Sequence, residues 1–150
     1  MKHINLKIKL LSETCKVPTM AHSKDACFDL YADLGNKDKI IINPHETVYV
    51  PTGIATEIPV GWWAPIFARS GISSKRGLRP SQGVAVIDCN YRGEWKVPLH
   101  NESNIPQVVE NHERIAQFTL LESPVINLDI VDELSDSDRG SGGFGSSGKK

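Results

Sequence analysis

Apolar and polar residues alternate along short stretches of this chain with the two-residue period of β-strands, and helical periodicity is scarce. Pro, Gly, Asn and Asp separate the stretches, and these residues favour turns. The predicted strands are Asn5–Leu10, Lys39–Ile42, Thr47–Val50, Ile54–Ile58, Trp62–Phe67, Val84–Ile87, Trp95–Leu99, Arg114–Leu121 and Val125–Val131.

Strands at this spacing predict an all-β fold, a jelly-roll-like sandwich or barrel, rather than β-α-β units. One short helix is predicted over Ser70–Leu78, and Asp88–Gly93 is predicted to be the polar tip of a hairpin. The composition changes at Ser135, beyond which Phe144 is the only large apolar residue. We therefore expect a β domain over residues 1–134 and a flexible, glycine-rich C-terminal arm over residues 135–150, because such a tail buries too little apolar surface to fold on the body.

Composition and charge narrow the class of protein. Hydrophobic residues make up 39% and charged residues 23% of the chain, as in ordinary globular proteins, and the net charge is −1. No general attraction to nucleic acid or to anionic membranes is expected at that charge. Cys15, Cys27 and Cys89 are odd in number and lack a pairing framework, and no signal peptide or membrane-length apolar run is visible. These features predict a cytoplasmic protein that binds neither nucleic acid nor membrane.

Two familiar motifs are incomplete. Gly143 to Lys149 has the spacing of a phosphate-binding loop, but Lys150 stands where a Ser or Thr is required. His112 and Glu113 begin a zinc motif in which Ala116 replaces the second His, so a zinc site is not expected. The Gly and Ser amides of the tail still suit a phosphate chain, as does Arg139, which can donate in a bidentate manner.

Five segments, several of which have an ordinary structural explanation when taken alone, together resemble the five motifs of the trimeric dUTPase family. In chain order they are ACFDLYAD (residues 26–33), ARSG (68–71), GVAVIDCNYRGE (83–94), HERIAQ (112–117) and RGSGGFGSSG (139–148). The resemblance covers most of the chain. It implies a homotrimer with active sites between subunits, in which one subunit supplies the third motif, a neighbour the second and fourth, and the third its arm. The implied activity is hydrolysis of dUTP to dUMP and pyrophosphate, which limits uracil in DNA and supplies dUMP for thymidylate synthesis.

The resemblance also implies roles at the nucleoside. Asp88 matches the family's general base, which deprotonates a water that attacks the α-phosphorus. Tyr91 matches the residue that packs on the deoxyribose and excludes a 2′-hydroxyl. Phe144 is expected to stack on uracil when the arm closes. The backbone that is expected to read uracil is that of Gly83, Val84, Ala85, Val86 and Ile87.

Further roles are implied at the phosphates. Mg²⁺ is the expected cofactor, bridging the three phosphates without a direct protein ligand, and Asp29 is expected to assist it through a water. The residues that resemble the family's triphosphate contacts are Arg69, Ser70, Gly71, Gln117, Arg139, Gly145, Ser146 and Ser147.

The chain departs from the family pattern at several positions. Ala68 replaces a Pro, Asn90 an acid, Ala85 a Gly and Gln82 an Asn, and the last two affect the shape of the uracil pocket. Two other functions stay open. One is a dCTP deaminase of the same fold, which would release ammonia from dCTP. The other is a dUTPase-like regulatory protein that binds a partner with little or no catalysis.

Overall fold

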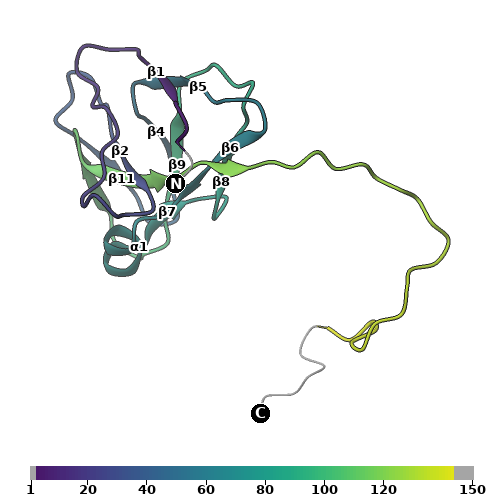
Figure 1. The fold of residues 1–150 in the computed structure, drawn as a ribbon. Coiled ribbons are helices and arrows are strands. Elements are labelled where there is room, and N and C mark those ends of the chain that lie inside the picture. Colours follow the sequence, from purple (N-terminus) through teal and green to yellow (C-terminus); the bar gives the residue numbers. More distant parts are fainter. Residues whose placement is uncertain (1–2, 144–150) are drawn as a thin grey trace.

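The computed structural model describes residues 3–143 and consists of strands with one short helix (Figure 1). This confirms the predicted all-β class. The elements are β1 (Lys7–Leu10), β2 (Phe28–Tyr31), β3 (Lys39–Ile42), β4 (Thr47–Pro51), β5 (Ile54–Glu57), β6 (Trp62–Phe67), α1 (Ser70–Arg76), β7 (Leu78–Pro80), β8 (Ala85–Ile87), β9 (Lys96–Asn101), β10 (Gln107–Glu110), β11 (Arg114–Phe118) and β12 (Leu121–Glu122).

Strand pairing is antiparallel throughout the described sheets and follows a nested order. β2 pairs with β11, β3 with β10 and β4 with β9, so strands from the first half of the chain meet strands from the second half in reverse order. This nesting is the rolled-up hairpin of a jelly roll. β6 lies between β11 on one side and β8 on the other, and β12 pairs with the beginning of β6.

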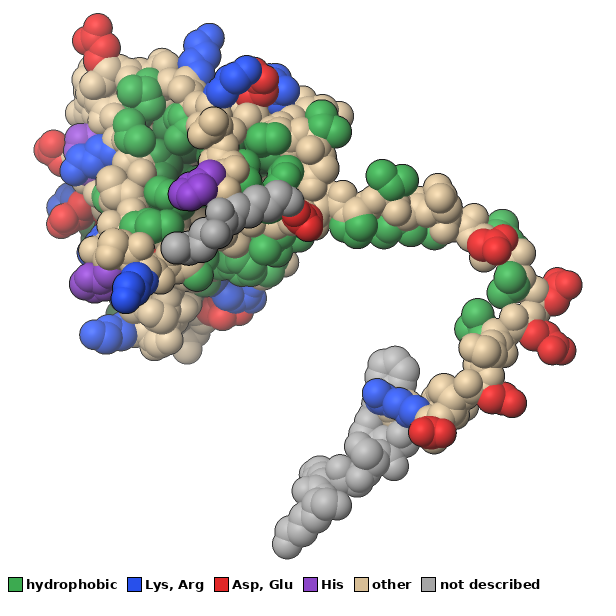
Figure 2. Space-filling model, in the orientation of Figure 1, with side chains coloured by type: hydrophobic (Ala, Val, Ile, Leu, Met, Phe, Trp, Pro, Cys, Tyr) green, Lys and Arg blue, Asp and Glu red, His purple; other side chains and the backbone are tan. Residues whose placement is uncertain are grey.

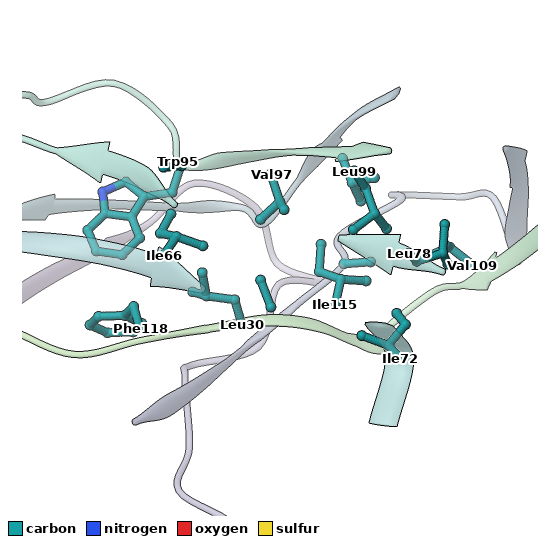
Figure 3. Packing of buried hydrophobic residues seen from close by; sticks show 14 of the residues in the cluster. Leu30, Ile66, Ile72, Leu78, Trp95, Val97, Leu99, Val109, Ile115 and Phe118 are labelled. Carbon is teal, nitrogen blue, oxygen red and sulfur yellow. The ribbon is translucent and has the colours of Figure 1, made fainter. Parts of the chain in front are cut away.

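A single apolar core holds these small sheets together (Figure 3). Trp95, fully buried, packs edge-on against Phe118 with ring centroids 4.9 Å apart. Phe118 also stacks on Phe28 at 5.8 Å. Because aromatic side chains bury large apolar areas, this cluster fixes β2, β11 and the start of β9 against one another.

Several predicted elements need correction. Leu78 lies in β7 and not in the helix, because Gly77 takes a left-handed conformation (φ 67°) that ends α1 at Arg76. The stretch Asp88–Gly93 is not a hairpin tip: β8 pairs with β6, whereas β9 pairs with β4 and β7. It is a loop that connects two sheets, and we call it the β8–β9 loop.

The predicted strand over Val125–Val131 is also wrong for the single chain. The chain leaves the body after β12 and extends away from it (Figure 1). Apolar and acidic side chains lie exposed along this projecting segment, residues 123–134 (Figure 2). Ile126, Leu128 and Ile130 are 74%, 89% and 96% exposed. The alternation is that of a strand, but no strand of its own chain pairs with it within the described residues.

Candidate functional site

A polar pocket of about 350 Å³ opens where β6 ends and α1 begins. Residues from three of the five motif segments meet here, although they lie far apart in the sequence. The pocket is lined by Ala21, Asp25, Ala26, Cys27, Asp29, Arg69, Ser70 and Gln117. The structure therefore brings together four of the residues that the sequence predicted for a site: Asp29, Arg69, Ser70 and Gln117.

Strand register explains how Asp29 and Gln117 come together. Gln117 of β11 lies opposite Asp29 of β2 and also opposite Phe67 of β6. Directly opposite residues in antiparallel strands point to the same face, so both polar side chains are presented beside the end of β6. The Gln117 amide donates from Nε2 to the carbonyl oxygen of Ala68, at 2.9 Å, and this bond connects β11 to the segment that carries Arg69.

Asp29 is the electrostatic centre of the pocket. The residue is only 6% exposed, and its carboxylate accepts hydrogen bonds from Arg69 Nε at 2.6 Å and from Arg114 Nη1 at 3.1 Å. The Asp29 carboxylate thus holds Arg69, a charged hydrogen-bond donor, at the wall of the pocket. Burial raises the pKa of the neighbouring Cys27 thiol, and the carboxylates of Asp29 and Asp25 raise it further, so that thiol is protonated at neutral pH.

Arg114 is the residue that the sequence reasoning missed, although it lies within the HERIAQ segment. Strict alternation along β11 from Gln117 would place Arg114 opposite Ala32, on the face away from Asp29, whereas its observed register partner is Tyr31, which shares the face of Asp29. The register shifts between Arg114 and Ala116, and a β-bulge of this kind re-aims a side chain. A charged residue at the start of an apolar strand was the available signal, but the bulge that directs it was not visible.

Ser70 and Gly71 are exposed at the start of α1, beside Arg69. The backbone of Arg69 is extended (φ −85°, ψ 135°), and its carbonyl oxygen accepts from the backbone amide of Ser73. The structure therefore presents the segment from Arg69 to Gly71 as the turn that starts the helix, with Ser70 and Gly71 open to a ligand.

Asp88 and Tyr91 lie at a different place, in the β8–β9 loop. Ile87 pairs with Ala64 near the beginning of β6, whereas Arg69 follows its end. With a rise of about 3.3 Å per residue, Asp88 and Arg69 of one chain are on the order of 15–20 Å apart. The structure does not bring these two predicted site residues together within one chain.

The β8–β9 loop is built from its own hydrogen bonds. The Tyr91 amide donates to the Asp88 carbonyl oxygen at 3.1 Å, and the Tyr91 hydroxyl donates to the Glu94 carbonyl oxygen at 3.0 Å. A Cβ at Gly93 would lie 2.4 Å from the Tyr91 hydroxyl oxygen, so glycine gives the ring room to fold back. Asp88 is left exposed, and Tyr91 is 43% exposed.

The strand before this loop presents its backbone at the edge of the sheet. Gly83 (φ 75°) makes the turn into β8, and Val84 and Val86 are exposed. Ala85 is buried opposite Ile66, and Ile87 is half-buried. Ala85 lies in regular strand, so this departure from the family pattern is accommodated without strain.

The structure describes only some of the residues that the sequence predicted for the C-terminal part of the site. The Arg139 guanidinium donates from Nε to the Gly142 carbonyl oxygen at 2.6 Å, in a turn beyond the projecting segment, where it contacts none of the pocket residues. Phe144, Gly145, Ser146 and Ser147 lie outside the described residues. Within residues 3–143 no group of three His, Cys, Asp or Glu side chains is arranged to hold a metal ion. The same residues include no helix long and apolar enough to cross a membrane.

Comparison with known proteins gives a consistent result. The dUTPase family model matches residues 13–148. A deoxyuridine 5′-triphosphate nucleotidohydrolase of Clostridioides difficile is 40% identical over 144 residues, which cover 96% of this chain and 98% of the relative.

Solved structures agree with the sequence matches. The dUTPase of Staphylococcus bacteriophage 80alpha, determined with dUPNHPP, superposes with a TM-score of 0.86 and 28% identity, over 96% of this chain and 98% of that one. That work describes phage dUTPases as controlling the transfer of virulence genes by a proto-oncogenic G protein-like mechanism. A phage phi11 dUTPase of S. aureus, 21% identical with a TM-score of 0.78 over 89% of this chain and 100% of that one, coordinates a structural Mg(II) ion.

Proposed function

The chain belongs to the dUTPase family, and from that premise we propose how its residues hydrolyse dUTP to dUMP and pyrophosphate. The observation that carries the proposal is the gathering of Arg69, Ser70, Asp29 and Gln117 in one polar pocket. The guanidinium group of Arg69 is a charged donor that suits a triphosphate.

We assign the chemical step to Asp88. Its exposed carboxylate, held at the end of β8, is free to accept a proton from a water molecule and to orient that water toward the α-phosphorus. The bond that forms joins the water oxygen to the α-phosphorus, and the bond that breaks releases pyrophosphate. Arg69 and the donors of Ser70, Gly71 and Gln117 are proposed to hold the phosphates in line.

The nucleoside is assigned to the other half of the site. The exposed edge of β8, from Gly83 to Ile87, offers main-chain donors and acceptors for uracil, and the Tyr91 ring is proposed to lie against the deoxyribose. Arg139, Phe144, Gly145, Ser146 and Ser147 are proposed to close over the bound nucleotide. Bound Mg²⁺ would neutralise negative charge on the triphosphate, and Asp29 would assist it through a water molecule.

We propose a homotrimer because one chain separates the two halves of the site. Asp88 and Arg69 lie at opposite ends of β6, so a complete site needs Asp88 from one subunit and Arg69 from another. The projecting segment supports association, since exposed apolar side chains in such a row are unfavourable in water. An apolar groove of about 480 Å³ beside β1, which pairs only with β5 among the described strands, is a fitting place for a neighbour's segment.

The proposal also includes a division of the chain into a body, residues 1–134, and an arm, residues 135–150. It places the protein in the cytoplasm. The location is supported by three free thiols, at Cys15, Cys27 and Cys89, which suit a reducing compartment. The arm boundary is supported by the tail composition, while the chain already leaves the body after Glu122.

A panel of nucleotides tests the function directly. Purified protein with Mg²⁺ is expected to release pyrophosphate from dUTP, and far less from dTTP, dCTP or UTP. Ammonia released from dCTP would favour the deaminase. The likeness to the phage 80alpha protein is the observation that favours the regulatory alternative. A folded trimer that binds dUPNHPP but turns over none of the nucleotides would support that alternative and contradict hydrolysis.

A further inference from the structure

Arg114, Asp29 and Arg69 form a continuous chain of ion pairs from the surface to the pocket. Arg114 Nη1 donates to one carboxylate oxygen of Asp29 at 3.1 Å, and Arg69 Nε donates to the other at 2.6 Å. The side chains are 44%, 9% and 25% exposed respectively, so Asp29 is the buried member. A buried carboxylate is stable only when its oxygens are satisfied, and here each arginine satisfies one of them.

These contacts determine which part of Arg69 a ligand can reach. Nε is engaged by Asp29, and Nη1 donates to the Arg114 carbonyl oxygen at 3.3 Å. Nη2 makes no hydrogen bond within the described part of the chain. Both anchors therefore lie on the side of β2 and β11, and one nitrogen of the guanidinium remains for a ligand. Arg114 itself does not line the pocket.

We infer that Arg114 and Asp29 are positioning residues: Arg114 fixes the Asp29 carboxylate, and the carboxylate fixes Arg69 in the orientation that receives the triphosphate. The inference rests on the proposed function, because it takes the triphosphate to be the ligand of Arg69. It gives Asp29 a role through arginine in addition to the expected role beside a metal-bound water, since each carboxylate oxygen can accept more than one hydrogen bond.

The bulge in β11 is what makes the arrangement possible. Without the shift between Arg114 and Ala116, the alternation of the strand would not direct Arg114 to the carboxylate. The Arg114 side chain is exposed and is not part of the apolar core. Its replacement is therefore expected to leave the packing of β11 intact.

The test measures binding of two ligands to Arg114→Ala by titration followed by NMR. The dUTP analogue dUPNHPP has the base, the sugar and a triphosphate chain, whereas deoxyuridine has the base and sugar alone. Loss of an orienting charged hydrogen bond is expected to weaken dUPNHPP by about 10- to 100-fold. Deoxyuridine binding is expected to change less than about two-fold, because its contacts lie in the other half of the site. Arg114→Lys, which retains the charge, is expected to recover part of the loss.

Chemical rescue adds a readout that a purely structural residue would not give. Millimolar guanidinium ion is expected to restore part of the dUPNHPP affinity of Arg114→Ala by occupying the vacated position beside Asp29. Arg79→Ala is the matched control, because Arg79 pairs with Glu102 at the protein surface away from the pocket. It removes the same charge and should leave both affinities unchanged.

The outcomes separate this inference from the function beneath it. Equal weakening of both ligands by Arg114→Ala, or unchanged dUPNHPP affinity, overturns the positioning role. Arg69→Ala is measured alongside. If it weakens dUPNHPP while Arg114→Ala and Asp29→Asn do not, only this inference fails. If Arg69→Ala is also without effect, the proposed phosphate site fails with it.

Discussion

The two ends of β6 carry the two halves of the candidate site, and they are constructed differently. At the end of the strand, Arg69 is fixed by a buried carboxylate and joined to β11 and β2 by side-chain hydrogen bonds. At its beginning, the β8–β9 loop holds Asp88 and Tyr91 by backbone turns and leaves both exposed. The proposed phosphate half is thus preorganised within one chain, whereas the proposed catalytic half presents its groups outward, where the proposed trimer would place a neighbour.

The largest expected effect lies in the catalytic half. Asp88→Asn should lower kcat by at least about 100-fold, because a positioned general base contributes that much or more. The trimer and its affinity for dUPNHPP should be retained, which sedimentation and titration can check. Asp38→Asn, an exposed acid elsewhere, serves as the control. Full activity in Asp88→Asn would remove this carboxylate from the mechanism.

Mixed trimers test whether the two halves meet across subunits. Asp88→Asn and Arg69→Ala chains, each inactive alone, are co-expressed with different tags and the mixed species isolated. A site that takes Asp88 from the Arg69→Ala chain and Arg69 from the Asp88→Asn chain is intact, so about one site in three should work in the isolated mixed trimers. Mixing Asp88→Asn with Asp88→Ala gives no such site. Recovery no greater than in that control would mean that one chain supplies both halves.

Deleting Arg139–Lys150 examines what the arm adds to both halves. Activity should fall by more than about ten-fold, since closure excludes water and completes the contacts to the nucleotide. The melting temperature should stay nearly unchanged, because Arg139 and its turn are exposed in the free chain. A large loss of thermal stability would show that the arm is part of the folded body.

Tyr91→Ala tests the sugar contact. UTP hydrolysis relative to dUTP should rise by about ten-fold, because the ring that excludes a 2′-hydroxyl is gone. Tyr91→Phe loses the hydroxyl that donates to Glu94 but keeps the ring, so it should retain the preference for dUTP. Unaltered discrimination in Tyr91→Ala would place the selection elsewhere.

The smallest effect comes from a change that touches neither half. Burial alone would raise the pKa of Asp33, but hydrogen bonds from Ser12 and Thr14 outweigh it and lower the pKa in the folded state. Ser12→Ala should therefore reduce the free energy of unfolding by about 1–2 kcal/mol at pH 7, with kcat unchanged.

The pH dependence of that loss follows from the direction of the shift. The stabilisation is present above the unfolded carboxyl pKa of about 3.9 and disappears as the pH falls through the lower folded value. Denaturant melts at fixed protein concentration, at pH 7 and near pH 3, measure it. A deficit that grows toward acid pH would contradict the Asp33 assignment.

The sequence predicted much of the fold because alternation is a local signal. β3 and β6 begin and end where the pattern places them, and α1 begins at Ser70 as predicted. The nested pairing of β2, β3 and β4 with β11, β10 and β9 was not readable, since pairing is a long-range property. β2, β7 and β10 were missed: β7 has three residues, and β2 and β10 have four, the shortest run in which alternation can be recognised.

The site was predicted through its motifs, not through its contacts. Asp29, Arg69, Ser70 and Gln117 do meet in one pocket, as motif order implied. The ion pair between Arg114 and Asp29 was not foreseen, because it depends on a bulge in β11 that leaves no mark in the composition of the strand. The predicted strand over Val125–Val131 failed for a related reason: a strand pattern states what a segment can pair with, but not in which chain its partner lies.

The length of β6 has one further consequence. Its six residues, Trp62–Phe67, fix how far the proposed general base, Asp88, lies from Arg69 of the same chain. Insertion of a single residue would turn every later side chain to the opposite face, and insertion of two would preserve the faces but lengthen the spacing by about 7 Å. Insertions are therefore expected to be better tolerated in the loops of this fold than in β6, whose length would set the geometry at all three boundaries of the proposed trimer.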